Sequence, residues 1–355
     1  MEEKNNVLSE DIKFDFDDIL IEPTKQSDII TRKEINIKYG LHLPLIAAPM
    51  DTVVSKKNVN KFTKKNINVC MPRGENIEGI DIGANMVFIS YSLIEFTELF
   101  ISKKADKYPS HVLIDIANGH MSDLVYVTKK AKEYYGKSMQ LMVGNIANPK
   151  TYKILSEAGA DFIRVGIGNG NACSTTVHTG IGYPLASLIE ECYKVSLTLK
   201  KEKRAKIVAD GGMKNYSDII KALALGSDYV MIGSLFNKAI ESCGMNYKDT
   251  WYKSKKEISQ KKAENLHKKG KTVYKKFRGM STKEVQKKWG NKNLKTSEGV
   301  IRFRPVEYTL EGWIENFDHY LRSAMSYTNF KEIEDFVGGP QINKISYQSY
   351  ERYNK

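Results

Sequence analysis

The chain has 355 residues, of which 41% are hydrophobic and 27% are charged, and its formal net charge is +13. This composition is typical of a folded protein with a sizeable core and excludes global disorder. No apolar run reaches membrane-spanning length, and the acidic, polar start lacks an apolar signal region, so we expect a cytoplasmic protein without membrane contact.

Eight short apolar runs rich in β-branched residues predict strands that are buried on both faces. They occupy residues 44–50, 67–71, 86–91, 111–115, 139–143, 161–166, 206–209 and 228–232. Helix-like segments separate these runs, and two of the segments end at glycine. The alternation predicts an α/β fold, and eight units favour a closed (β/α)8 TIM barrel over an open Rossmann-like sheet, which stays the structural alternative.

A lysine-rich stretch at 245–297 follows the eighth predicted strand and carries much of the excess positive charge. Because loops after barrel strands surround the active site, we expect a mobile flap here. Its lysines either form a solvated surface or attract anions, with phosphorylated small molecules favoured over nucleic acid. The pattern of residues 310–327 predicts the closing helix, and residues 336–355 are interpreted as a C-terminal tail. We therefore expect residues 1–355 to form a single barrel domain.

A glycine-rich loop, GIGNGNACSTT, follows the sixth predicted strand and contains Cys173. Glycine lets a backbone approach a ligand closely and present carbonyls to a cation or amides to an anion. Four widely spaced cysteines without a Cys-X-X-Cys pair suggest neither a zinc site nor a disulfide framework. Cys173, with Thr175 two residues later, is therefore either a nucleophile or a structural cysteine.

The seventh and eighth predicted strands end in ADGG and MIGS. Glycines at these strand ends expose backbone amides that suit a phosphate group, and Asp210 could accept from ribose hydroxyls. Tight turns without a ligand are the alternative.

Many motifs occur in the order found in the IMP dehydrogenase/GMP reductase family, which the chain resembles over roughly residues 13–335. These motifs are FDDILIEP, LIAAPMDTV, DIANGH, GNI, VGIGNGNACSTT, TGIGYP, ADGG, MIGSLF, FRGMS, SEG and LRSAMSY.

The resemblance implies that Cys173 attacks carbon 2 of a purine nucleotide and forms a covalent thioimidate. Thr175 and Glu298 resemble the pair that protonates the departing amine. The implied substrate-binding positions are Asp210, Gly211, Gly212, Gly233, Ser234, Gly279, Met280, Ser281, Lys295, Ser297 and Gly299.

The resemblance also implies a nicotinamide cofactor, NADPH, and a monovalent cation, K+. The implied cofactor positions are Thr31, Arg32, Asp115, Ile116, Ala117, Ile167, Gly168, Met280, Leu294, Lys295, Ser323, Ala324, Met325 and Ser326. Lys295 and Arg32 are candidates for binding the extra phosphate of NADPH. The implied cation positions are Gly168, Gly170, Cys173 and Thr176, although Thr176 replaces a common arginine, and Asn169 and Asn171 replace the usual proline and serine.

Within the family the chain is more similar to the reductase branch, which converts GMP to IMP and ammonia. Three features resemble the reductase branch: no Arg-Tyr dipeptide occurs between Arg278 and Glu298, the interval from GMS to SEG is short, and the motif TGIGYP is present. Two other motifs, FRGM and SEGV, resemble that branch less. The resemblance implies a homotetramer that binds GMP, IMP and NADPH. The alternatives are an IMP dehydrogenase without a regulatory module and a catalytically silent paralogue that binds nucleic acid.

Overall fold

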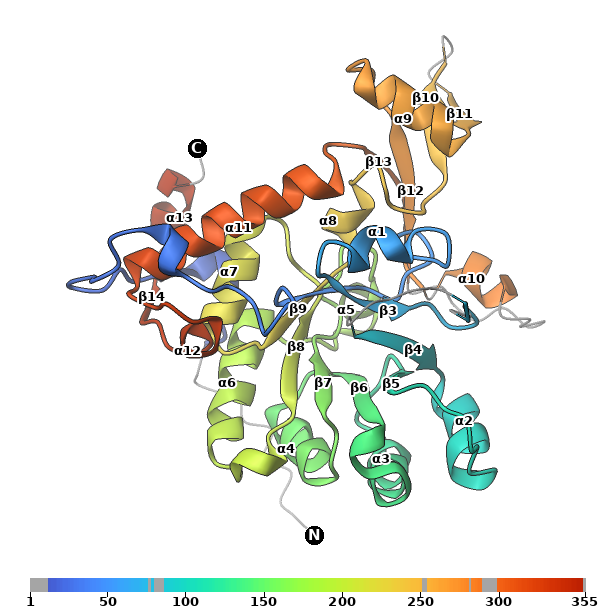
Figure 1. Ribbon diagram of the computed structural model, residues 1–355, viewed down its shortest axis with the longest axis vertical. Helices are drawn as coiled ribbons and strands as arrows, with labels where there is room; N and C mark the ends of the chain where they lie inside the picture. The colour runs from blue at the N-terminus through green and yellow to red at the C-terminus, as the bar shows by residue number, and fades with distance from the viewer. Residues whose placement is uncertain are drawn as a thin grey trace.

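Eight parallel strands form a closed barrel in the computed structural model, which describes residues 12–75, 78–79, 86–250, 254–280, 282–288 and 299–353 (Figure 1). In chain order they are β2 (Leu45–Ala47), β3 (Asn68–Met71), β4 (Val87–Tyr91), β5 (His111–Asp115), β6 (Gln140–Ile146), β7 (Phe162–Val165), β8 (Lys206–Asp210) and β9 (Tyr229–Ile232). The barrel closes where β2 pairs with β9 in parallel. All eight predicted strands are confirmed, and the open-sheet alternative is wrong.

Helices surround the barrel and follow its strands. They are α1 (Val59–Thr63), α2 (Leu93–Phe96) with η3 (Thr97–Ser102), α3 (Ser122–Tyr135), α4 (Pro149–Glu157), α5 (Thr175–Thr179), α6 (Leu185–Leu197), α7 (Tyr216–Ala224), α8 (Ser234–Asn237) and α11 (Leu310–Tyr327). Side-chain caps fix the first residues of two helices. At α4 the Asn148 side chain accepts from the Lys150 amide, and Pro149 is the first helical residue. At α7 the Asn215 side chain accepts from the Asp218 amide. The predicted closing helix is confirmed as α11.

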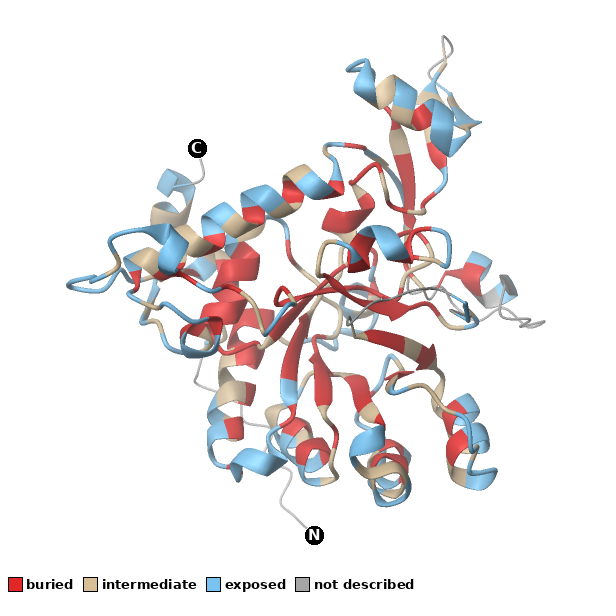
Figure 2. Ribbon diagram, in the orientation of Figure 1, coloured by how far each residue is buried: buried red, intermediate tan, exposed pale blue. Residues whose placement is uncertain are grey.

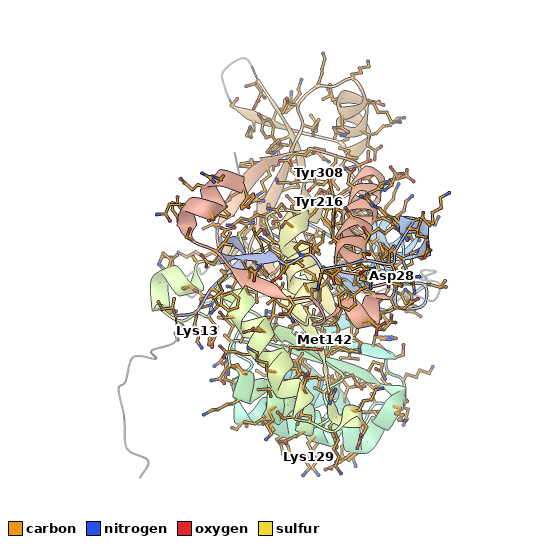
Figure 3. The ribbon with its side chains drawn as sticks, turned by 90° about the vertical axis from the view of Figure 1, so that its left-hand side faces the viewer. Lys13, Asp28, Lys129, Met142, Tyr216 and Tyr308 are labelled. Carbon is orange, nitrogen blue, oxygen red and sulfur yellow. The ribbon has the colours of Figure 1, made fainter. Side chains whose placement is uncertain are left out.

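Two apolar layers form the core, one inside the barrel and one between the strands and the helices. Met142, labelled in Figure 3, belongs to the inner layer, where it lies with Cys70 and Phe88. Figure 2 shows the barrel strands almost wholly buried, whereas the helices expose their outer faces. The barrel strands are therefore almost continuously apolar because both faces of this parallel sheet are covered.

Between β9 and α11 the chain leaves the barrel pattern and builds a four-stranded antiparallel sheet, here called the insertion sheet. Its elements are β10 (Asn246–Asp249), β11 (Lys255–Ile258), α9 (Gln260–Lys268), β12 (Tyr274–Arg278), α10 (Lys283–Lys288) and β13 (Ile301–Pro305). The strands lie in the order β11–β10–β12–β13, and β10, β11 and α9 project from the barrel (Figure 1). The Arg278 guanidinium, 2.7 Å from the Asp51 carboxylate, anchors β12 to the loop after β2.

Both ends of the described chain pack against the barrel's outer helices. The predicted tail contains β14 (Ile342–Lys344), which pairs antiparallel with β1 (Ile19–Ile21), and α13 (Tyr347–Tyr353). Lys13 reaches α6, with its Nζ 2.7 Å from the Glu191 carboxylate (Figure 3). The smaller elements are η1 (Phe16–Asp18), η2 (Arg32–Glu34), η4 (Gly136–Ser138), η5 (Lys201–Lys203) and α12 (Ile333–Phe336). Across the part of the chain that the structure describes, no helix has both the length and the apolar character needed to cross a bilayer.

Candidate active site

A cavity of about 220 Å³ lies at the carboxyl ends of the barrel strands. Its walls come from the loops after β2, β5, β7, β8 and β9 and from the end of β12. This is the end of a (β/α)8 barrel at which catalytic residues gather, because the eight βα loops converge there.

The loop after β7 folds tightly and presents Cys173 at this cavity. Gly168 has a φ of +83°, and a Cβ atom there would lie 1.7 Å from the Thr176 hydroxyl oxygen, so only glycine fits. The Cys173 amide donates to the Gly170 carbonyl over 2.9 Å, which closes a turn before the thiol. The thiol itself donates to the Thr175 hydroxyl, with Sγ 3.2 Å from Oγ1.

Cys173 is the one exposed cysteine of the four. Cys70 and Cys192 are fully buried, and burial raises the pKa of each thiol far above its usual value. Burial likewise raises the pKa of the Cys243 thiol to about 12. Since the thiolate is the reactive species, only Cys173 combines exposure with a position in the cavity.

The glycine pair after β8 lies directly against the cysteine loop. Gly211 and Gly212 have φ values of +94° and +76°, which L side chains rarely adopt. A Cβ atom on Gly211 would lie 2.9 Å from the Gly170 amide nitrogen. Asn171 extends the contact to the next loop, since its amide donates to the Ser234 hydroxyl over 3.0 Å. The two strand-end glycine motifs and the cysteine loop thus form one continuous wall.

The base of the insertion sheet pairs with the same loop. Gly299 and Cys173 form an isolated antiparallel bridge, and the Val300 amide donates to the Ala172 carbonyl over 3.1 Å. A Cβ atom on Gly279 would lie 2.5 Å from the Ala172 carbonyl oxygen, so this close approach requires glycine. The segments on either side of the 281–298 interval are therefore held against the cysteine loop.

Sequence reasoning missed a buried charge network on the cavity floor. Arg164 of β7 is 6% exposed, and its guanidinium nitrogens lie 2.6 Å from the Asp115 carboxylate and 2.8 Å from the Asp210 carboxylate. Asn145 donates to the same Asp210 oxygen over 2.8 Å, and Arg73 lies 3.8 Å from Asp115. Burial would lower the pKa of Arg164, but the charges of Asp210 and Asp115 outweigh it and raise that pKa.

Two signals could have revealed this network. Arg164 is a charged residue in the middle of the predicted strand 161–166, whose other charged residue, Asp161, lies at its very start, and Asn145 lies in the GNI motif. A charge that is expensive to bury suggests a function or a partner when it occurs in such a strand.

The structure brings most of the predicted site residues together. Those lining the cavity are Cys173, Thr175, Asp210, Gly211, Gly212, Gly233, Ser234, Gly279, Met280, Gly299, Asp115, Ala117, Ile167, Gly168 and Gly170. Ile116 and Thr176 flank it without lining it, and the Thr176 hydroxyl donates to the Ile181 carbonyl over 2.7 Å. Five predicted residues lie outside the described residues: Ser281, Leu294, Lys295, Ser297 and Glu298.

The remaining predicted cofactor residues form a separate group that does not line the cavity. Thr31 and Arg32 belong to the N-terminal segment, which packs on α11 beside Ser323, Ala324, Met325 and Ser326. Arg322 makes this contact, because its guanidinium donates to the Arg32 carbonyl over 3.2 Å and also to the Ile35 carbonyl. Met325 is fully buried, so its side chain is not open to a ligand here.

Comparison with known proteins agrees with this geometry. Residues 94–353 match the family model described as "IMP dehydrogenase / GMP reductase domain". The chain is 28% identical to a GMP reductase of Buchnera aphidicola subsp. Schizaphis graminum, with 96% of this chain and 97% of the relative covered. It is 25% identical to a GMP reductase of Onchocerca volvulus (96% and 93% covered) and 26% identical to one of Shewanella halifaxensis (98% and 99% covered). The chain belongs to the IMP dehydrogenase/GMP reductase family.

Proposed function

We propose that this protein is a GMP reductase, which uses NADPH to convert GMP to IMP and ammonia. The observation that carries the proposal is the exposed Cys173 thiol, 3.2 Å from the Thr175 hydroxyl, in a cavity shared with Asp210 and the glycine pair. Full-length similarity to proteins named GMP reductase supports the same reaction. The family binds purine nucleotides and uses a nicotinamide cofactor.

The cavity offers separate groups for each part of a purine nucleotide. Asp210 accepts from ribose hydroxyls, and Arg164 and Asn145 hold its carboxylate in place. The backbone amides at Gly211 and Gly212 and the Ser234 hydroxyl suit the phosphate, because amides freed from secondary structure bind anions. The base then lies between Cys173 and the insertion segment at Gly279 and Met280.

The chemistry of the cysteine follows from its neighbours. The Cys173 thiolate adds to carbon 2 of GMP, and the amino group leaves as ammonia after it gains a proton, so that a thioimidate remains. An amide anion cannot leave at neutral pH, and the Thr175 hydroxyl, coupled to Glu298, passes the required proton. After reduction at carbon 2 the thiolate leaves again and IMP is released. In total GMP, NADPH and two protons give IMP, NADP+ and an ammonium ion.

The cavity residues fit a nicotinamide cofactor beside the nucleotide. Ala117 and Ile167 provide an apolar wall, and Asp115 provides a carboxylate for ribose hydroxyls. The two terminal nitrogens of Arg164 bind the carboxylates, while its buried Nε atom has no hydrogen-bond partner among the described residues. When bound, NADPH supplies the hydride. We assign the separate group at Arg32 and Ser323 to the cofactor site of a neighbouring copy in a homotetramer.

The loop also fits K+. Its donor set consists of neutral oxygens, namely the carbonyls of Gly168, Gly170 and Cys173 and the Thr176 hydroxyl, which suits a hard monovalent cation. This cation would fix the loop that carries the nucleophile. We also infer that residues 245–297 act as the flap of a single catalytic domain, because the segment that follows them pairs with the cysteine loop at Gly299.

The proposal is tested by adding GMP to the protein with NADPH and following loss of NADPH absorbance together with IMP formation. We expect turnover that Cys173→Ser abolishes, while GMP still binds, because serine keeps the shape but is a far weaker nucleophile at neutral pH. NADH formation from IMP and NAD, without GMP-dependent NADPH oxidation, would instead identify an IMP dehydrogenase. Absence of both reactions, with salt-dependent RNA binding that survives Cys173→Ala, would identify the silent paralogue.

A further inference from the structure

The two sides of the insertion sheet differ in charge. Because successive strand residues point to opposite sides, the pairing registers show which residues share a side. One side, here called the cationic side, consists of Asn246, Lys248, Lys256, Ile258, Lys275, Phe277, Arg302 and Arg304. Five of these eight described residues are cations, and none is an acid. The acids of the described strands, Asp249 and Glu257, lie on the other side.

Helix α9 extends the cationic side. It packs there through Gln260, whose side-chain carbonyl accepts from Asn246 over 2.9 Å and from Lys275 over 3.2 Å. The buried Ala263 lies on the inner face of the helix. The exposed lysines of α9 and its C-cap are Lys261, Lys262, Lys268 and Lys269. Since residues seven apart lie on the same face of a helix, these lysines line its outward face, and strands and helix together form one surface of positive charge.

Like charges lie close together on this side. Lys248 lies directly opposite Lys256 in the pairing of β10 with β11, and Lys275 lies opposite Arg304 in the pairing of β12 with β13. Like charges that face each other across two strands destabilise a sheet. Burial and the charge of Arg302 also lower the pKa of the Arg304 guanidinium. A bound anion would relieve this repulsion, so the arrangement favours an anionic ligand.

The exposed cations of this side also lack counter-charges. Within the part of the chain that the structure describes, no carboxylate forms an ion pair with Lys248, Lys256, Arg302, Arg304 or the outward lysines of α9. The outer helices of the barrel differ, because α3, α4 and α6 each pair a lysine with a glutamate of the same helix. The excess of positive charge in the insertion is therefore available to an external anion.

The shape of the cationic side favours an extended anion. The sequence pattern alone favours small phosphorylated molecules, but none of these exposed lysines and arginines lines the catalytic cavity. They lie instead on a helix and on strands, of which α9, β10 and β11 project from the barrel (Figure 1). Such a surface suits a row of phosphates better than a single one.

The apolar surface of the insertion sheet lies on its other side. Ile301 and Phe303 are 47% and 44% exposed there, and the Phe303 ring lies 4.8 Å from the Tyr247 ring. Single-stranded nucleic acids stack their bases on aromatic rings, and membrane-bound helices insert apolar side chains into lipid. Among its described residues the cationic side exposes no aromatic ring, since Phe277 is buried. Its chemistry therefore fits phosphate contacts to a duplex.

We propose that the cationic side of the insertion sheet binds a nucleic-acid duplex through its phosphate backbone. The outward lysines of α9 and Lys256 contact successive phosphates, and Arg302 and Arg304 donate to phosphate oxygens in the two-pronged manner of guanidinium groups. Contacts of this kind carry no sequence information, so binding is sequence-independent and sensitive to salt. The site is separate from Cys173 and is compatible with catalysis there.

Titration of a fluorescently labelled RNA duplex with the full chain, followed by anisotropy at several salt concentrations, measures this binding. Lys261→Gln combined with Lys262→Gln should weaken binding about tenfold and reduce the slope of log K against log salt by about 1.8, since each phosphate contact contributes about 0.9. The matched control is Lys200→Gln combined with Lys201→Gln, which removes two adjacent exposed lysines from the turn after α6. Equal weakening by both double variants would mean general charge attraction and would overturn the site.

Lys256→Glu separates binding from folding. The new carboxylate would face Lys248 and replace a repulsive pair with an attractive one, so the melting temperature should stay unchanged or rise. Duplex binding should nevertheless weaken about tenfold or more, because a phosphate contact becomes a repulsion. Unchanged duplex binding in this variant would contradict the proposal.

Other ligands complete the test. RNA and DNA duplexes of equal length share the phosphate contacts, so both should bind, and the tighter of the two identifies the natural source. Tighter binding of the single strands, binding to phosphatidylserine vesicles but not to duplexes, or no duplex binding at all would overturn the proposal. Duplex binding should persist at saturating GMP and in Cys173→Ser, and its loss in either case would place the duplex at the catalytic cavity instead.

Discussion

Arg164 of β7 and Lys275 of β12 are both buried strand cations, but their surroundings differ. Arg164 lies in the barrel between the carboxylates of Asp115 and Asp210. Lys275 lies in the insertion sheet, where its Nζ donates to the Ser242 carbonyl over 2.5 Å and to the Gln260 side-chain carbonyl over 3.2 Å. One charge is neutralised by two opposite charges, and the other is only solvated by neutral oxygens.

The two environments shift the pKa values in opposite directions. The carboxylates around Arg164 overcome burial and raise its pKa, so its charge is permanent. Burial lowers the pKa of Lys275 to about 8, although the charges of Glu241 and Glu264 act in the other direction. The barrel thus keeps a fixed charge where ligands are expected, whereas the insertion sheet contains a cation that titrates close to neutral pH.

The largest effect should come from Arg164→Met. The variant leaves the Asp210 carboxylate without its ion-pair partner and leaves Asp115 with only Arg73, 3.8 Å away, and breaking such a network costs about 3–5 kcal/mol of unfolding free energy. Urea denaturation followed by circular dichroism measures this loss. Arg164→Lys, which keeps the charge but not the two-pronged geometry, should recover part of the stability. If both variants were as stable as the wild type, the network would not be the electrostatic centre of the barrel.

The next effect is a pH dependence in the insertion sheet. Between pH 8 and pH 10.5 the folded state binds fewer protons at Lys275 than the unfolded state does, so the unfolding free energy rises with pH in this window. The difference in stability between the wild type and Lys275→Met should therefore grow by about 2.5 kcal/mol from pH 7 to pH 10. Comparing the two proteins cancels the titration of other groups. A difference that is constant over this range would contradict the shifted pKa.

At pH 7 alone, Lys275→Met should have a smaller effect. The variant removes the two hydrogen bonds of Lys275 but also removes a charge that is costly to bury, so we expect a loss of about 1 kcal/mol. Thermal unfolding at pH 7 measures it. A loss as large as that in Arg164→Met would show that both cations depend on opposite charges in the same way.

The same contrast explains which features the sequence could predict. All eight barrel strands were predictable, because parallel strands covered on both faces are continuous apolar runs. The strands of the insertion sheet were not predicted: β11 reads KKEI, and its lysine-rich pattern resembles a solvated loop. The position of Cys173 at the catalytic end of the barrel was predictable from its glycine loop after the sixth strand, whereas its exposure was not, because the sequence left a structural cysteine as the alternative.

Contacts between distant segments could not be predicted in this way. Arg164 is 49 residues from Asp115 and 46 from Asp210 along the chain, and only the pairing of β5, β6, β7 and β8 brings the three together. Likewise, nothing local indicates that Gly299 pairs with Cys173. The predicted cofactor residues at Arg32 and Ser323 lie together but do not line the cavity. Their position depends on the path of the chain, which residue types alone do not reveal.

The smallest expected effect concerns an exposed ion pair of the insertion sheet, which provides the baseline for both buried cations. Lys255 lies 2.8 Å from the Asp249 carboxylate, and both side chains contact solvent, at 28% and 51% exposure. Because water screens such a pair, Lys255→Met should cost only about 0.2–1 kcal/mol of unfolding free energy, and added salt should reduce the loss. Denaturation at low and high salt measures both quantities. We expect added salt to reduce the stability lost in Lys255→Met but to leave the losses in the Arg164 and Lys275 variants unchanged. That result would show that burial, and not charge alone, sets the size of these effects.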